Sequence, residues 1–174
     1  MISEVQQLLE RYARKGILVD TNILLLYYVG TINRQRITRF NRTEQFIPED
    51  YDLLVRLLQS FERIATTPNI LTEVSSFINQ LFEPERSQCY DLFAGHIKVL
   101  QETYIPSTEV AIQDWPFYKY GLTDCGIASL AKDSYLAKDS YLVLTDDLKA
   151  AFYLQSQGID TLNFNNIRTL GWNL

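Results

Sequence analysis

The sequence predicts an α/β fold, a three-layer α/β/α sandwich with a central parallel sheet, in a single domain that spans residues 1–174. Two observations predict this fold class. Short apolar runs such as Ile17-Leu18-Val19 are typical of strands that are buried on both faces of a parallel sheet. Stretches with apolar residues at helical spacing separate these runs, and strands that alternate with helices pair in parallel.

The first half of the chain is predicted to hold four helices and two strands. Gly16 ends the first helix, and Pro68 after Thr67 starts the fourth, since proline suits the first helical position. Residues 31–43 are polar and rich in arginine, and they are the least typical of a packed domain. In order, we expect a helix at 3–15, a strand at 17–19, helices at 23–29 and 48–61, a strand at 64–67 and a helix at 68–82.

The second half continues the alternation. A helix is predicted at 84–102, then a brief strand at 104–105 before a loop through Pro106 and Pro116. Thr123 is the expected N-cap of the next helix, because its side chain can accept a hydrogen bond from the open first turn. The remaining elements are a helix at 123–131, a strand at 141–145, a helix at 148–157 that ends before Gly158, and a strand at 161–164.

The hexamer Ala-Lys-Asp-Ser-Tyr-Leu occurs twice in tandem, at 131–136 and 137–142. Two copies of six residues are too short and too few for a repeat architecture, so a recent duplication is the favoured interpretation. We expect the second copy to lead into the strand at 141–145, and the first to lengthen the preceding helix or to loop out. Deleting 131–136 should therefore leave a folded protein of equal or greater thermal stability.

Charge and cysteine content narrow the function classes. The net charge of −5 argues against a protein that coats nucleic acid through a broad basic surface, but it allows an enzyme that touches a few phosphates. Cys89 and Cys125 make neither a disulfide framework nor a metal knuckle, which favours a reduced, cytoplasmic setting. No apolar run reaches the length that spans a bilayer, so no membrane partner is expected.

Acidic residues recur where predicted strands end and helices begin. Asp20 follows the first strand, Glu73 lies early in the helix after the second, Asp124 opens a helix, and Asp146 and Asp147 follow the strand at 141–145. Taken singly, each has an ordinary explanation as a cap, a turn residue or an exposed helix residue. Ligand sites of open parallel sheets lie beyond the C-terminal ends of the strands, so these carboxylates are expected to converge. A helix N-terminus would also help to hold Asp124 ionised.

Converging carboxylates repel one another and need a counter-charge. Two unit charges about 4 Å apart repel by about 4 kcal/mol at an effective dielectric constant of about 20. A whole domain is stable by only about 5–15 kcal/mol. A divalent cation offsets this repulsion, and an all-oxygen site suits Mg²⁺ or Mn²⁺. Such ions activate water for attack on phosphorus, so no histidine or cysteine nucleophile is required.

Four segments, taken together, resemble the PIN-domain nucleases. They are Ile17-Leu-Val-Asp-Thr-Asn22, Thr67-Pro-Asn-Ile-Leu-Thr-Glu73, Leu122-Thr-Asp124 and Leu142-Val-Leu-Thr-Asp-Asp147. Each is unspecific alone, but their order and rough spacing carry the resemblance from Gly16 to Phe164. It implies a PIN-like fold and a metal-dependent endoribonuclease, in which Mg²⁺ or Mn²⁺ activates water for phosphodiester hydrolysis. Many relatives are toxins of toxin–antitoxin pairs and are often dimeric, which implies RNA, a protein antitoxin and a second copy as partners.

The resemblance assigns roles residue by residue. The catalytic metal ligands it implies are Asp20, Glu73, Asp124 and Asp147. The fourth acid of the family follows a Thr-x-Asp pattern, which selects Asp147 and leaves Asp146 as the alternative. Asn22 and Thr145 correspond to supporting hydrogen-bonding residues.

Two departures from the family's pattern leave other functions open. The segment between Asp20 and Glu73 is longer than in compact toxin members, and the repeated hexamer lies between Asp124 and Asp147. A catalytically weak PIN-like module that binds RNA or protein is therefore an alternative. Another phosphoryl-transfer enzyme, such as a phosphatase, is less favoured, because the residue two positions after Asp20 is Asn22 and not a second carboxylate.

A basic run precedes the third predicted helix, and it consists of Arg34, Arg36, Arg39 and Arg42. One interpretation is an RNA-binding arm that contacts phosphates beside the acidic site. The other is a solvated loop whose arginines pair with nearby acids. The aromatic residues at 115–120 could stack on bases, but a core or dimer contact is the commoner role of such a cluster.

Overall fold

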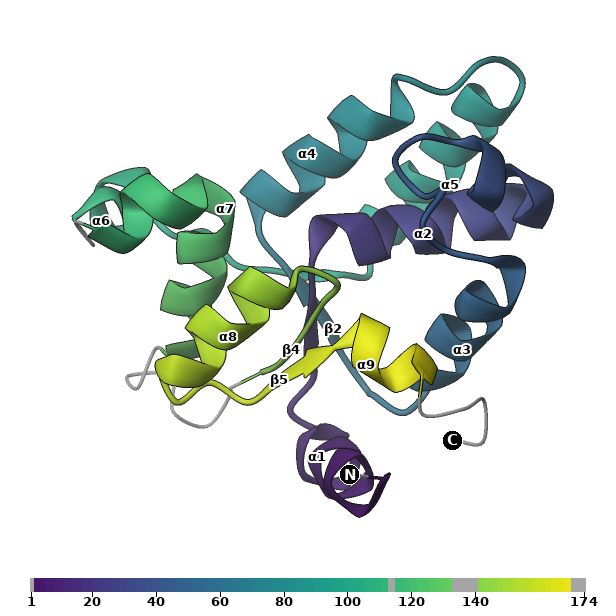
Figure 1. Ribbon diagram of the computed structural model, residues 1–174. Helices are drawn as coiled ribbons and strands as arrows, with labels where there is room; N and C mark the ends of the chain where they lie inside the picture. Colours follow the sequence, from purple (N-terminus) through teal and green to yellow (C-terminus); the bar gives the residue numbers. More distant parts are fainter. Residues whose placement is uncertain (1, 113–114, 133–140, 170–174) are drawn as a thin grey trace.

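The computed structural model describes residues 2–112, 115–132 and 141–169, and they form helical layers around one parallel sheet (Figure 1). The sheet has five strands in the order β3-β2-β1-β4-β5, and every neighbouring pair is parallel. This confirms the predicted α/β sandwich. In chain order the elements are α1 Ile2–Tyr12, β1 Ile17–Val19, α2 Thr21–Ile32, η1 Arg34–Arg39, α3 Pro48–Leu58, β2 Ile64–Thr66, α4 Pro68–Ile78, α5 Glu85–Ile97, β3 Gln101–Glu102, α6 Ser107–Ala111, α7 Trp115–Lys132, β4 Leu142–Thr145, α8 Leu148–Ser156, β5 Thr161–Asn163 and α9 Phe164–Thr169.

The centre of the sheet is β1, which pairs with β2 on one side and with β4 on the other. In this register Leu18 lies between Ala65 and Val143. The three residues of β1 are fully buried. Burial of this kind requires helices on both faces of the sheet, which explains the uninterrupted apolar sequence of the strand.

The order of strands reverses direction at β1. The chain moves outward through β2 and β3, then returns to the other side of β1 and continues through β4 to β5. Because crossovers between parallel strands are right-handed, the helices that connect β1 to β2 and β2 to β3 cover one face, and those that connect β3 to β4 and β4 to β5 cover the other. Packing agrees with this layout: α2 contacts α3, α4 and α5, whereas α8 contacts β4 and β5.

Helix starts place polar residues at the ends of the strands. Thr67 caps α4 by accepting a hydrogen bond from the Ile70 N–H at 3.3 Å, and Pro68 takes the first helical position, as predicted. The helix α2 begins at Thr21, two residues earlier than predicted, so Asp20 is the N-cap at the junction of β1 and α2. A short strand that leads directly into a helix fixes this carboxylate tightly.

The prediction that residues 31–43 are the least globular part of the chain was wrong. They include the 3-10 helix η1, which packs against α2 and α3. Ile37 and Phe40 are buried, and the Thr43 hydroxyl donates to the Ile37 carbonyl oxygen at 2.8 Å. The segment is mostly polar, but its few apolar residues are directed toward the core. The average polarity of the segment therefore does not reveal that it is packed.

The second half departs from the prediction at four places. The strand predicted at 104–105 lies instead at Gln101–Glu102, as β3, because the predicted helix ends at Ile97 and does not continue to residue 102. The predicted loop contains α6 and the first part of α7, which begins at Trp115; the part of α7 after Gly121 corresponds to the helix predicted at 123–131. Helix α7 is interrupted at Gly121, whose φ of 77° is a conformation that glycine adopts without strain. The last helix, α9, was not predicted.

Residues 133–140, which contain most of the two hexamers, lie outside the described residues, as does the side chain of Trp115. The expectations for the repeat therefore stay predictions. In the described part of the chain, no helix combines the length and the apolar character that crossing a membrane requires.

Candidate functional site

The reversal of strand order brings the ends of β1 and β4 together. Val19 pairs with Leu144, and the Asp20 N–H donates to the Leu144 carbonyl oxygen at 3.0 Å. The residues that follow the two strands, Asp20 and Asp146, are therefore neighbours. The crevice beyond the strand ends at such a reversal is where open α/β sheets bind ligands.

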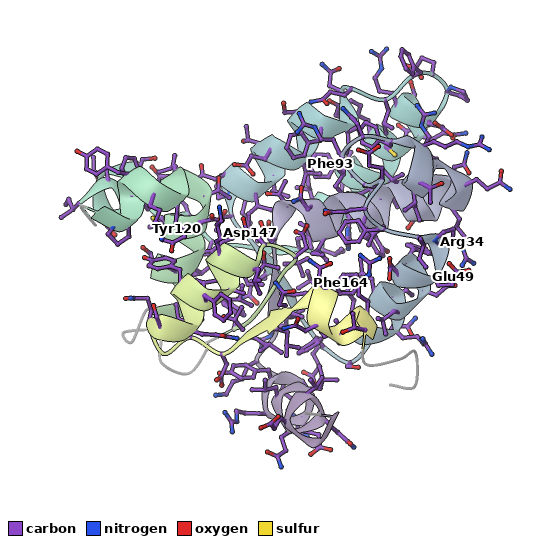
Figure 2. All side chains as sticks on the ribbon, viewed as in Figure 1. Arg34, Glu49, Phe93, Tyr120, Asp147 and Phe164 are labelled. Atoms are coloured by element: carbon purple, nitrogen blue, oxygen red, sulfur yellow. The ribbon has the colours of Figure 1, made fainter. Side chains whose placement is uncertain are left out.

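A cleft of about 400 Å³ opens at this end of the sheet. Four of the predicted carboxylates line it, each from a different segment, and they are Asp20, Glu73, Asp124 and Asp147. In Figure 2, Asp147 and Tyr120 mark two sides of this region, near α8 and α7 respectively. The expected convergence of the carboxylates at one site therefore holds in the structure.

Asp20 is the most buried of the four, with a relative exposure of 8%. Its Oδ2 accepts from the Thr145 hydroxyl at 2.6 Å, and its Oδ1 accepts from the Thr21 N–H at 2.6 Å. The pKa of Asp20 is raised to about 6, mainly because the carboxylate is buried; the two hydrogen bonds lower it, and the charges of Asp146 and Glu73 add to the rise. The predicted supporting role of Thr145 thus has a direct geometric counterpart.

Glu73 is held by two hydroxyl groups that the sequence did not single out for this role. The Thr21 hydroxyl donates to one carboxylate oxygen at 2.8 Å, and the Thr123 hydroxyl donates to the other at 2.5 Å. These contacts join α2, α4 and α7 around one carboxylate. Thr123 was expected to cap a helix, but α7 already runs through this position and its hydroxyl turns to Glu73 instead.

Asp124 lies one residue after Thr123, in the part of α7 that follows the break at Gly121. Its pKa is raised to about 7, mainly by burial and then by the charges of Asp20, Asp147 and Glu73. A helical segment starts again after Gly121, so Asp124 lies near a helix start as expected. That this position helps to hold Asp124 ionised stays a prediction, because the net shift of its pKa is upward.

Asp146 and Asp147 are adjacent but take different roles. Asp147 is exposed at the cleft and caps α8, where its Oδ1 accepts from the N–H groups of Lys149 and Ala150 at 2.6 and 3.1 Å. Asp146 is buried, and its Oδ2 accepts from the Gln45 amide at 2.7 Å and from the Asn22 amide at 3.4 Å. Asn22, predicted as a supporting residue, therefore supports Asp146.

A second set of contacts ties Asp146 to the unpredicted helix α9. The Asn165 amide donates to the Asp146 backbone carbonyl at 2.8 Å. Arg168 donates to the Gln45 carbonyl oxygen at 3.0 Å and forms an ion pair with the buried Asp50 at 2.9 Å. The guanidinium of Arg168 thus joins α3, the loop that carries Gln45, and α9 beneath the site.

The four arginines of the basic run do not act as one arm. Arg34 pairs with Asp52, and Arg36 pairs with Glu85 at 3.1 Å. Arg39 is exposed. Only Arg42 of the four lines the cleft.

The donor set of the cleft fits a hard divalent cation. It offers carboxylate oxygens, which Mg²⁺ and Mn²⁺ prefer. Among the described residues, however, no group of three or more His, Cys, Asp or Glu side chains is placed to hold one ion together. Asp20 and Glu73 have both carboxylate oxygens in hydrogen bonds, which keeps the acids spread around the cleft. Mg²⁺ is commonly held by one or two carboxylates plus water and substrate phosphates, and this arrangement allows such binding.

Comparison with known proteins adds no relative to these observations. No family model, no curated protein and no solved structure matches the chain. The functional assignment rests on the four motifs and on the geometry of the cleft.

Proposed function

We propose that this protein is a PIN-like endoribonuclease that depends on Mg²⁺ or Mn²⁺. The observation that supports this most is the cleft at the strand reversal, where Asp20, Glu73, Asp124 and Asp147 meet from four segments. Their order in the sequence matches the motif order of the PIN-domain nucleases. A cleft that gathers negative charge without a basic partner for each acid is suited to a cation and a phosphate, and not to an anion alone.

The electrostatics of the cleft support the same proposal. Burial first, and then the neighbouring acids, raise the pKa of Asp20 to about 6 and that of Asp124 to about 7, so these carboxylates are costly to ionise without a counter-charge. The residues that would hold a cation are Asp20, Glu73, Asp124 and Asp147. A bound Mg²⁺ or Mn²⁺ would supply Lewis-acid activation of water and charge stabilisation at the leaving oxygen.

The chain's own residues have two further tasks in this proposal. The hydroxyls of Thr145, Thr21 and Thr123 hold Asp20 and Glu73 in fixed orientations before any ligand arrives. Asp20 and Asp124, whose negative charges repel each other, supply the charge that attracts the cation. Pre-positioned carboxylates avoid a costly rearrangement when the substrate binds.

The test is cleavage of a mixed structured RNA with Mn²⁺ or Mg²⁺, compared with EDTA and with Asp20→Asn. We expect cutting that needs the metal and falls in the variant by on the order of 100-fold or more, the scale for losing one electrostatic contact to the reacting group. Asp91→Asn is the matched control, because Asp91 is exposed on α5, away from the cleft residues. Metal-independent cutting, or full activity of Asp20→Asn, would contradict the proposal.

A second candidate is a catalytically weak PIN-like module that binds RNA or protein. It is favoured by one observation, the absence among the described residues of three acidic side chains grouped closely enough for one ion. Well-folded protein that binds RNA but yields no product with either metal would support this candidate. A protein antitoxin and a second copy of the chain remain the partners that the resemblance suggests.

A further inference from the structure

One side chain of opposite charge lines the acidic cleft in the described part of the chain, and it belongs to Arg42. Its guanidinium lies 4.4 Å from the ring centroid of Phe77, and its Nε donates to the Gln80 side-chain oxygen at 3.1 Å. Phe77 lies in α4, and Gln80 follows the end of that helix. Stacking on a ring and one hydrogen bond fix the plane of a side chain that would otherwise rotate freely.

The two terminal nitrogens of Arg42 remain available. Among the described residues, neither takes part in a hydrogen bond or ion pair. A guanidinium presents such donors as a planar fork that matches two oxygens of a phosphate. The carboxylates on the other walls repel a phosphate, so the side chain that offsets this repulsion decides where the phosphate is held.

Other arginines of the basic run lack this combination. Arg34 and Arg36 already pair with Asp52 and Glu85, and neither lines the cleft. A paired guanidinium must give up its partner before it binds a phosphate. Arg34 and Arg36 are therefore held by ion pairs within the protein, whereas Arg42 lines the cleft that contains the carboxylates.

The size of the cleft limits what can enter it. About 400 Å³ is the scale of a pocket for a small molecule or a nucleotide. Asp20 lies at its inner side with only 8% exposure, so a reacting phosphate must come deep into the cleft.

We infer that Arg42 holds a backbone phosphate of the RNA, next to the phosphodiester that faces the carboxylates. This inference rests on the proposed function, since it takes RNA as the substrate. It narrows the phosphate contact from an arginine arm to one residue. Single-stranded DNA carries the same phosphates, so the experiment includes it as a separate arm.

The experiment measures binding of a labelled single-stranded RNA of 12 nucleotides by fluorescence anisotropy, with Mn²⁺ and in an Asp20→Asn background. We expect Arg42→Ala to raise Kd about tenfold at low salt and to reduce the slope of log K against log salt by about 1. Arg42→Lys should recover part of the affinity. Arg86→Ala removes the same charge from an arginine on α5 that pairs with Glu83, and it should leave Kd unchanged.

Several results would overturn the inference. They are an Arg42→Ala Kd within twofold of the parent, or a loss of equal size in Arg34→Ala. Equal sensitivity of single-stranded DNA supports a contact with phosphate, whereas binding of DNA without any Arg42 dependence counts against it. An unchanged melting temperature shows that each variant is folded.

The binding assay separates this inference from the proposed function. Arg42-dependent binding by a protein that never cuts RNA would refute the nuclease proposal and leave the Arg42 contact standing. Metal-dependent cutting whose KM and Kd are unaffected by Arg42→Ala would refute the contact alone.

Discussion

Asp50 and Asp20 are both buried carboxylates, but Asp50 lies against a guanidinium whereas Asp20 lies among other acids. Asp50 has no exposed surface, pairs with Arg168 at 2.9 Å and accepts from the Ile47 N–H at 2.8 Å. Asp20 has 8% exposure, and its hydrogen-bond donors are a hydroxyl and one N–H, without a cation. The same chain therefore pairs Asp50 with a cation in its framework and, among the described residues, leaves Asp20 without one.

The surroundings of Asp50 are typical of a carboxylate that stabilises the fold, and those of Asp20 are typical of a carboxylate in a functional site. A buried carboxylate beside a cation has part of its desolvation cost offset by Coulomb attraction. A buried carboxylate beside other carboxylates has that cost increased, which is a common property of active sites. The arrangement around Asp20 costs the protein stability, and a ligand that neutralises the cleft would restore it.

The largest effect on stability is expected from Arg168→Met. It removes the guanidinium that faces Asp50, bonds the Gln45 carbonyl oxygen and anchors α9. Breaking a buried ion pair from one side costs about 3–5 kcal/mol, which lowers the melting temperature by roughly 6–15 °C in a chain of this size.

Arg34→Met is the matched control for Arg168→Met, because its pair with Asp52 is half-exposed. It should cost no more than about 1 kcal/mol. Equal melting temperatures for the two variants would show that Arg168 does not stabilise the framework as described. Acidification should lessen the defect of Arg168→Met, since protonated Asp50 no longer needs a counter-charge.

Asp20→Asn should have a smaller effect of opposite sign. The pKa of Asp20 in the folded protein is about 6, above its ordinary value of 3.8, so the folded state binds the proton more tightly than the unfolded state. The resulting stability is present below about pH 4 and is lost as pH rises through about 6. The variant should therefore gain up to about 3 kcal/mol at pH 8.

Melting curves from pH 4 to 8 test this prediction. The wild-type protein should lose stability across the window, and Asp20→Asn should show a flatter profile. Asp52→Asn is a control on an exposed acid that pairs with Arg34, and it should not flatten the profile. A variant that is less stable than wild type at pH 8 would mean that Asp20 is a framework acid like Asp50.

Asp147→Asn should have the smallest effect on stability, although Asp147 lines the cleft. Asparagine caps helices about as well as aspartate, so α8 should keep its start and the free energy of unfolding should change by less than about 0.5 kcal/mol. Asp147→Ala loses the cap as well and should cost about 1 kcal/mol. If Asp147→Asn also retains full RNA cleavage, Asp147 is only a cap and Asp146 becomes the better candidate for the fourth acid.

Much of the fold could be predicted from local patterns. The bounds of β1 match the prediction, and β2, β4 and β5 each differ from it by one residue. All of β1 and the first three residues of β4 are apolar and buried because both faces of the sheet are covered, which leaves a clear signal in the sequence. By contrast, β3 consists of Gln101 and Glu102, and only its pairing with Ala65 and Thr66 makes it a strand.

Part of the candidate site could likewise be predicted from the sequence, and part could not. The positions of Asp20, Glu73, Asp124 and Asp147 followed from their places after strands and in helix starts, because the ends of parallel strands share one edge of the sheet. Sequence patterns could not distinguish Asp146 from Asp147. The two differ only because Asp146 turns inward to the amides of Gln45 and Asn22, whereas Asp147 turns outward to cap α8.

By itself, the sequence determined the fold class and the acids expected at one edge of the sheet, because strand burial leaves local apolar patterns and parallel strands end at the same edge. Only the tertiary structure decided the partner of each acid. Thr21 and Thr123 reach Glu73, and Arg168 reaches Asp50, across separations of 50 residues or more. Contacts of that range depend on how whole helices pack, and no local spacing in the chain encodes them.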